Sequence, residues 1–485
     1  MATAGEPASA VDDAQTLTPI ERWLRESPPW LLSAAVHIAA LICLAVWLTG
    51  ASIEQAVWLD GEYSEQPGEQ LIEEPLQLDT LAELTIDQPV FEPQPLPPVV
   101  DPIAMPSLAK PLLAGTLLAS DTTSDVIGVS LSGREPGARA KLLEAYGGTQ
   151  ATEKAVLEGL RWLARQQRPD GGWSLRGPYK DGIGFENAEA ATAMALLAFQ
   201  GRGFTHQGDP SEKFTKVVRR GWARLLKSQD RDGNFFQDGG PHHHRIYTQA
   251  QAAIALCELY GMTRDDAYRE PAQAAIDYLV DIQAPEGGWK YAPGVRSDLS
   301  VTGWVVMALQ SAGMAGLDVP SPVFDRVRSF LDEVSRGQGS FRGSEYGYEP
   351  RRGPSIAMTA EGLLCRQYLG WQRDDIRLQA GAARLLENPP KWRGGRSVYY
   401  WYYATQVCHH MEGDIWTAWN SKIREVLPAH QMKRGAERGS WSPRGDRYGD
   451  SGGRLYVTCL SIYTLQVYYR HLPIYRGGLL SGKLE

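Results

Sequence analysis

The sequence has few cysteines, no excess of basic residues and only one long apolar run. Its five cysteines, Cys43, Cys257, Cys365, Cys408 and Cys459, are far apart and form no Cys-x-x-Cys pair. This excludes a disulfide framework and a zinc knuckle as organising features, and it favours buried apolar thiols. A net charge of −8 offers no basic surface to a nucleic acid, so we expect no nucleic-acid partner.

Motifs of several common enzyme chemistries are also missing. No Ser-His-Asp pattern stands out, and the stretch 450–453 lacks the lysine of a phosphate-binding loop. Three histidines at 242–244 lie in a Gly-Pro loop. His409 and His410 follow Cys408 on a predicted helix and point about 100° apart, which does not suit one metal ion. We therefore expect no metal and no cofactor.

The one long apolar run, residues 29–51, carries no formal charge and predicts a single transmembrane helix. Arg22 and Arg25 precede it, and no Lys or Arg follows until Lys110, so the positive-inside rule puts the rest of the chain outside the cytoplasm. The sequence thus predicts a single-pass protein of a bacterial inner membrane that contacts lipid through residues 29–51. A signal peptide is the alternative, but the long preceding tail and the lack of a cleavage site favour an anchor.

Composition divides the rest of the chain. Residues 1–28 are predicted to be a disordered tail, and 477–485 a C-terminal tail. Residues 52–145 carry twelve acidic residues before Lys110 and many prolines, which is typical of an extended linker. The remaining residues, 146–476, have the apolar periodicity of helices and form the predicted domain.

That domain consists of a unit repeated six times. Each copy has an amphipathic helix, a turn of glycine and an aromatic residue, and a second, more apolar helix. The turn aromatics stand at positions 173, 235, 289, 341, 392 and 441, a period near 50. The last predicted helix is as apolar as the middle ones, so an open stack would lack a polar cap. The sequence therefore predicts an all-α fold: an α/α toroid of six hairpins in two concentric rings.

The turn pattern Gln-x-x-x-Gly-x-aromatic recurs within the stretches 166–173, 229–235 and 283–289. It resembles the repeat of squalene cyclases and of protein prenyltransferase β-subunits, over about residues 150–475. The ending of the domain, at 453–458 and 468–473, also resembles bacterial membrane-anchored proteins with prenyltransferase/squalene-oxidase repeats. That resemblance implies the toroid, but it brings no established activity, because one barrel carries unrelated functions.

The stretch that begins at Asp298 is where both enzyme families would place their chemistry. Cyclases of the resembled family use Asp-x-Asp-Asp-Thr, but here Ser300 and Val301 replace the central acids. The prenyltransferases bind zinc through Asp-x-Cys and a later histidine, but Ser300 stands at the cysteine position and Val457 at the histidine position. Neither mechanism has its reactive groups. The Cys-Gly-Glu-Gln of thioester domains is absent too.

Other side chains remain candidates for a site in the lumen, the space enclosed by the inner ring. Asp298 is the catalytic candidate, and Glu361 is a possible second carboxylate for hydrolysis of a glycan. Aromatic rings on inner helices could contact a lipid or a sugar, although packing in the core explains them as well. The candidate substrate-binding residues are Ser300, Trp304, Tyr400, Trp401, Tyr403 and Tyr456.

The sequence favours a membrane-tethered module for binding or scaffolding, with a lipid, glycan or protein ligand. The alternative is an enzyme acting on an isoprenoid, another lipid or a glycan in the lumen. A degenerate cyclase that still holds terpenoids is a third interpretation and requires a continuous apolar lumen. The orientation of Asp298 discriminates between them: it either points into an open lumen or caps its helix from a solid core.

Overall fold

A computed structural model describes residues 129–237 and 240–475, all within the compact unit Met105–Glu485. The predicted transmembrane helix at 29–51 and the predicted tails at 1–28 and 477–485 lie outside the described residues. Within those residues, no helix is both long and apolar enough to cross a membrane.

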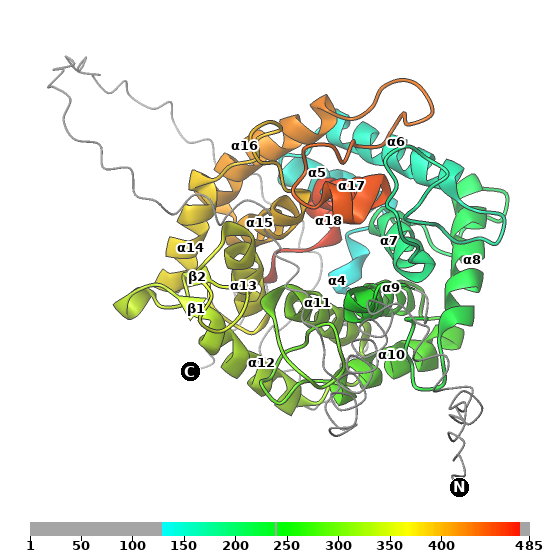
Figure 1. The fold of residues 1–485 in the computed structure, drawn as a ribbon. Helices are drawn as coiled ribbons and strands as arrows, with labels where there is room; N and C mark the ends of the chain where they lie inside the picture. The colour runs from blue at the N-terminus through cyan, green and yellow to red at the C-terminus, as the bar shows by residue number, and fades with distance from the viewer. Residues whose placement is uncertain (1–128, 238–239, 476–485) are drawn as a thin grey trace, which may run out of the picture. The chain divides into compact units, whose positions relative to one another are not determined.

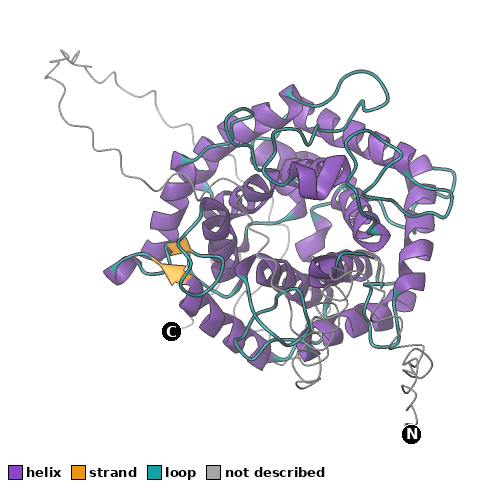
Figure 2. Ribbon diagram, in the orientation of Figure 1, coloured by secondary structure: helices purple, strands orange, loops and turns teal. Residues whose placement is uncertain are grey.

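Helices dominate the described chain, and two short strands form a single antiparallel pair (Figure 2). Six longer helices form an outer ring: α6 (Gln150–Gln166), α8 (Lys213–Leu225), α10 (Arg269–Asp281), α12 (Ser321–Val334), α14 (Ile376–Glu387) and α16 (Gly413–Ala429). Six form an inner ring: α7 (Ala188–Gly201), α9 (Arg245–Thr263), α11 (Leu299–Ala315), α13 (Ile356–Tyr368), α15 (Val398–Met411) and α17 (Gly449–Leu465).

The inner ring is closed. Each of its helices packs on the next in chain order, and α17 returns to pack on α7. In the outer ring, α16 packs on α6, so the last repeat also meets the first (Figure 1). The prediction of six hairpins in two concentric rings is confirmed.

The two rings differ in how their helices are buried. The residues of α11 are buried on nearly every side, because it packs between two inner neighbours and the outer ring. In contrast, α8 buries only one face, which includes Val218, Trp222 and Leu225. This difference follows the sequence, in which the first helix of each hairpin is amphipathic and the second is apolar.

The glycine of each regular turn fits closely against the next outer helix. Gly287 has a φ of +98°, and a Cβ atom there would lie 2.1 Å from the Arg326 carbonyl oxygen of α12. Gly171 and Gly233 meet α8 and α10 in the same way. Gly439, in the last turn, meets the Glu158 carbonyl of α6, so the motif also closes the ring. Only glycine allows both this φ and this approach.

Side chains of the motif complete each turn. The amide nitrogen of Gln283 donates to the Gly287 carbonyl of its own turn and to the Val323 carbonyl of α12. The indole of Trp289 donates to the Leu279 carbonyl at 2.7 Å, and its backbone N–H donates to the Thr302 hydroxyl at 3.0 Å. Polar and apolar parts of the motif therefore connect one outer helix, the next outer helix and the inner helix.

The fourth turn differs from the sequence prediction. Phe341, predicted as its aromatic, is 48% exposed, and the buried position is taken by Tyr346, whose backbone N–H donates to Thr359. The reason is an insertion: strands β1 (Ser335–Arg336) and β2 (Glu345–Tyr346) pair, with the 3₁₀-helix η6 (Gly339–Phe341) between them. Phe341 lies at the tip of this insertion, and Tyr346 lies where the chain comes back to the regular turn.

Short helices pack on the inner ring or on one another. These are α4 (Val129–Ser132) and α5 (Pro136–Ala145), which precede the first hairpin, and α18 (Val467–Arg470), which follows the last. Leu131 of α4 is buried against Gly261, near the end of α9. The ordered domain therefore begins before residue 146, where composition placed the end of the linker.

Candidate functional site

Asp298 caps the N-terminus of α11. Its Oδ1 accepts a hydrogen bond from the Val301 backbone N–H at 2.8 Å, and its Oδ2 accepts one from the Tyr348 hydroxyl at 2.8 Å. The residue is fully buried. Both carboxylate oxygens thus have defined structural partners, and the geometry is that of a helix cap within a packed core.

Hydroxyl groups surround this cap. The Tyr348 hydroxyl is 2.6 Å from that of Tyr291, and the Ser300 hydroxyl is hydrogen-bonded to that of Tyr247. These side chains come from α9, α11 and the loops that lead into the inner helices. Ser300 therefore has a polar partner near the N-terminal end of its inner helix.

Glu361 is the second carboxylate of this region. It is fully buried on α13, and its Oε2 accepts a hydrogen bond from the Tyr399 hydroxyl at 2.6 Å. Its other oxygen fits against Gly303 of α11, where an added Cβ would lie 2.1 Å away. Burial raises the pKa of Tyr399 and the charge of Glu361 adds to the rise, so this hydroxyl remains a proton donor in the hydrogen bond.

Aromatic rings cross the lumen. Trp304 of α11 stacks on Tyr402 of α15, with ring centroids 5.7 Å apart and planes at 20°, and it meets Tyr403 at 6.0 Å. Tyr402 in turn meets Tyr463 of α17 at 5.7 Å. Since α11, α15 and α17 lie on different sides of the inner ring, these contacts fill the space between them.

Two of the predicted lumen aromatics point elsewhere. The Tyr400 hydroxyl donates to the Leu385 and Asn388 carbonyls at the end of α14, and Trp401 packs against Trp392 at 6.4 Å. Both therefore contact the outer ring or its connecting turn, because five successive residues of a helix point all round its axis.

Tyr456 is half-buried on α17. Its ring lies close to Gly452: a Cβ atom added at this glycine would lie 2.4 Å from the ring. Burial raises the pKa of Tyr456, and the charges of Asp446 and Glu361 add to the rise. Tyr456 therefore remains a neutral hydroxyl.

A cavity of only 10 Å³ lies beside α18, between the C-terminal halves of α9 and α11. Its lining includes Glu258, Met307, Tyr402, Arg470 and His471. A volume of about 10–15 Å³ by this measure holds a single water molecule. The cavity is thus far too small for a terpenoid, and its lining is charged, so the continuous apolar lumen expected of a degenerate cyclase is not found here.

No metal site is evident in the part of the chain that the structure describes. Within residues 129–237 and 240–475, no group of three His, Cys, Asp or Glu side chains is placed to hold an ion. The cysteines Cys257, Cys408 and Cys459 are buried, and desolvation raises the pKa of each thiol. These thiols are core residues, not reactive groups.

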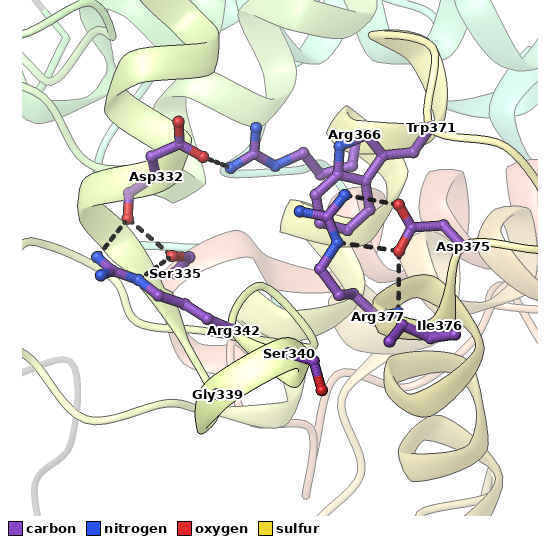
Figure 3. A pocket seen from close by; sticks show the side chains of 10 residues that line it. All are labelled: Asp332, Ser335, Gly339, Ser340, Arg342, Arg366, Trp371, Asp375, Ile376 and Arg377. Atoms are coloured by element: carbon purple, nitrogen blue, oxygen red, sulfur yellow. Dashed lines mark hydrogen bonds and ion pairs between the residues drawn. The ribbon is translucent and has the colours of Figure 1, made fainter.

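A much larger pocket, of about 680 Å³, lies on the outside of the barrel (Figure 3). It is bounded by the C-terminal end of α12, the β1–β2 excursion and the N-terminal end of α14. We call it the arginine pocket. Its lining residues are Asp332, Ser335, Gly339, Ser340, Arg342, Arg366, Trp371, Asp375, Ile376 and Arg377.

Arginine and tryptophan dominate the chemistry of the arginine pocket. The guanidinium of Arg377 lies 3.7 Å from the centre of the Trp371 ring, and that of Arg366 lies 4.9 Å from it. Arg342 approaches from the opposite wall, as Figure 3 shows. Trp371 holds Arg366 and Arg377 in place through cation–π contacts. Arg342 instead donates to the Ser335 hydroxyl and to the Asp332 carbonyl, each at 3.3 Å.

Two aspartates partly neutralise these arginines. Asp375 pairs with Arg377 at 2.6 Å, and Asp332 pairs with Arg366. Hydrogen bonds from Arg377 hold the pKa of Asp375 below its usual value, despite partial burial, so Asp375 is ionised at neutral pH. Three arginines against two aspartates leave the lining with one excess positive charge.

The sequence did not reveal the arginine pocket. Its residues come from 332–342 and 366–377, two stretches without a motif, and the first of these includes part of the insertion in the fourth turn. The one signal in the sequence was the irregular Gly-rich stretch 337–343, which departs from the regular turn.

Comparisons with known proteins give partial matches. No protein-family profile matches the chain. The chain is similar to a drimenyl diphosphate synthase of Streptomyces showdoensis, with 27% identity over 39% of this chain and 32% of that protein. It is also similar to a squalene–hopene cyclase of Bradyrhizobium diazoefficiens, with 25% identity over 41% of this chain and 31% of that protein.

A lanosterol synthase of Aspergillus fumigatus is 31% identical over 35% of this chain and 20% of its own length. The chain thus spans about a third or less of these curated relatives. Among solved structures, a type II terpene cyclase from Scytonema has a TM-score of 0.43 at 13% identity, covering 66% of this chain and 98% of that one. An α-1,6-mannanase of Salegentibacter has a TM-score of 0.45 at 11% identity, covering 66% and 99%. The chain is therefore similar in sequence, over part of its length, to enzymes that cyclise terpenoids.

Proposed function

We propose that this protein is a membrane-tethered binding module that recognises an acidic peptide segment of a protein partner in the arginine pocket. One contrast carries the proposal: the lumen cavity measures 10 Å³, whereas the arginine pocket measures about 680 Å³. A ligand larger than a water molecule has room on the outside of the barrel and none in this part of the lumen.

The chemistry of the arginine pocket favours a peptide with carboxylate groups. Arginine N–H groups form paired hydrogen bonds with carboxylates, and the excess positive charge attracts acidic residues. Phe341 and Ile376 are large apolar side chains beside the pocket and are 48% and 51% exposed. Tryptophan, phenylalanine and arginine are enriched at protein interfaces, so these residues suit a segment that alternates acidic and apolar side chains.

The test uses the full-length protein in mild detergent and a fluorescein-labelled peptide of glutamate and leucine. Fluorescence anisotropy should show saturable binding that weakens as salt is added, because exposed charges are screened. The matching peptide of lysine and leucine is the charge control and should not bind.

Charge reversal at the pocket should remove this binding. Arg377→Glu is expected to lower the affinity by about tenfold or more, since a paired arginine at an interface contributes about 1–2 kcal/mol. Arg328→Glu is the matched control, because Arg328 is an exposed arginine of α12 that does not line the pocket. Equal loss in both variants, or binding of the lysine peptide, would contradict the proposal.

The membrane tether belongs to the same proposal. Residues 29–51 would anchor the chain in the inner membrane of a bacterium, with the barrel outside the cytoplasm, as in the membrane-anchored repeat proteins that the sequence resembles. Alkaline phosphatase fused to the C-terminus should be active in a bacterial host, because that enzyme folds only in an oxidising compartment. Activity of a fused cytoplasmic reporter instead would refute this orientation.

The alternative function is an enzyme acting on an isoprenoid, another lipid or a glycan, and Glu361 is the observation in its favour. A buried carboxyl beside tyrosine hydroxyls is the kind of group that acts as an acid in catalysis. Incubation of the protein with squalene, followed by mass spectrometry, should give no product. A cyclised product that is lost in Glu361→Gln would replace the binding proposal with this one.

A further inference from the structure

The arginine pocket contains two ion pairs that differ in how firmly the carboxylate is held (Figure 3). The Oδ1 atom of Asp375 accepts hydrogen bonds from the Arg377 backbone N–H and from its Nε, each at 2.9 Å, and Oδ2 accepts one from its Nη2 at 2.6 Å. The bond from the backbone N–H also caps α14. Asp375 and Arg377 are therefore a fixed part of the pocket wall.

The second pair joins a buried cation to an exposed anion. The Nη2 atom of Arg366 donates to the carboxylate of Asp332, at the C-terminal end of α12. The side chain of Arg366 is 5% exposed, whereas that of Asp332 is 70% exposed. An exposed carboxylate is already well hydrated, so it loses little free energy when it leaves such a pair and turns into water. Asp332 is thus easily displaced.

Arg366 stays in place when Asp332 leaves. Its Nε donates to the Tyr346 hydroxyl at 3.0 Å, and its guanidinium lies over the Trp371 ring. Tyr346 is fully buried, and burial raises its pKa to about 12, so its hydroxyl is neutral and does not compensate the cation. A buried guanidinium without an anion is costly. A carboxylate that enters the arginine pocket therefore meets a cation in a fixed position that favours exchange of one carboxylate for another.

We infer that Arg366 binds a carboxylate of the ligand and that Asp332 is an internal competitor, which occupies Arg366 in the free protein and is displaced on binding. This inference rests on the proposed function of the arginine pocket and adds its regulation. Because Asp332 lowers the affinity for any carboxylate, a ligand needs further contacts, and the exposed side chains of Phe341 and Ile376 offer them to apolar residues. The competitor thus favours segments with acidic and apolar residues over small free carboxylates.

The test measures the affinity of the full-length protein, in mild detergent, for the labelled peptide of glutamate and leucine. Asp332→Asn removes the competing charge and should lower the Kd about fivefold, the upper end of what an ion pair with an exposed partner contributes. Asp325→Asn is the matched control: Asp325 lies on the same helix, is 74% exposed and pairs with Arg328 outside the pocket. It removes the same charge and should change the Kd less than about twofold.

Two further variants separate competition from a general effect of charge. Asp375→Asn also removes a negative charge from the lining, but it keeps the helix cap and loosens Arg377, so it should not tighten binding. In an Arg366→Gln protein, Asp332→Asn should no longer tighten binding, because the competed cation is gone. If Arg366→Gln does not fold, the comparison of Asp332→Asn with Asp325→Asn and Asp375→Asn decides the matter alone.

The outcomes distinguish this inference from the proposed function. If neither the unmodified protein nor Asp332→Asn binds the peptide, both are wrong. If the unmodified protein binds and Asp332→Asn binds no more tightly, or if Asp325→Asn or Asp375→Asn tightens binding equally, the inference alone is wrong. Binding by Asp332→Asn and none by the unmodified protein would support the inference in its strongest form, in which Asp332 blocks the pocket.

Discussion

The turn glycines allow a quantitative test of how the barrel is held together. In Gly287→Ala the new methyl group would have to lie 2.1 Å from the Arg326 carbonyl, which belongs to α12 and cannot rotate away without breaking the helix. Residue 287 also has a φ of +98°, which costs alanine about 1 kcal/mol. Crowding in a packed interior adds about 2–3 kcal/mol, so we expect a total loss of about 3–4 kcal/mol.

Gly294 supplies the matched control for this prediction. It lies in the same connection and has a φ of +67°, but an added Cβ would meet nothing within 4 Å. Gly294→Ala should therefore show only the backbone cost, about 1 kcal/mol. For a domain of this size each kcal/mol corresponds to about 2 °C in Tm, so thermal unfolding should give losses near 7 °C and 2 °C. Equal losses would refute the claim that contact with α12 is what requires Gly287.

Three further changes test the contacts around the lumen. Thr302→Val, which leaves the buried Trp289 N–H without its acceptor, should cost about 1–3 kcal/mol in urea unfolding, whereas Thr302→Ser should cost much less. Asp298→Ser should keep the cap of α11 and stay within about 1 kcal/mol of the original protein, and a larger loss would show that the carboxylate itself is needed. Glu258→Gln should destabilise the protein by about 3 kcal/mol at neutral pH. Burial alone would raise the pKa of Glu258, but Arg134 and Arg470 hold it below its usual value. Its contribution is therefore present above about pH 4.5 and is lost as the pH falls through the lowered folded pKa, so the pH dependence of unfolding at the acid end should be weaker in Glu258→Gln.

The fold could be predicted from the sequence because each recurring feature of the repeat serves a contact that is local in the chain. A glycine that must approach the next helix, a tryptophan and a glutamine recur at a fixed period, and each reports a contact within one hairpin or with the next. The fourth turn was assigned to Phe341 because the spacing there was regular. The excursion between β1 and β2 moves the aromatic to Tyr346, and spacing alone does not distinguish these two residues.

The sites were less predictable because they depend on contacts between distant segments. Arg134 lies in a stretch whose composition is that of a linker, yet it is buried against Glu258, 124 residues away. Arg366 and Arg377 line one pocket with Arg342, which lies in the insertion of the fourth repeat. Likewise, the direction of Tyr400 toward α14 depends on the rotation of α15, which a run of five aromatic residues does not reveal.

The place of Asp298 in the repeat explains why an acidic residue stands there without its reactive neighbours. The inner helices α7, α13 and α15 begin with Asn187, Ser355 and Ser397, and the side chain of each accepts a hydrogen bond from the third residue of its helix. Asp298 makes the same bond at the start of α11. Asparagine, serine and aspartate are interchangeable as caps, whereas only aspartate can give up a proton. In these three other repeats, the residue at this position cannot protonate a substrate. The function that all four residues share is therefore to cap the N-terminus of the inner helix. The carboxylate at 298 therefore needs no catalytic role to account for it.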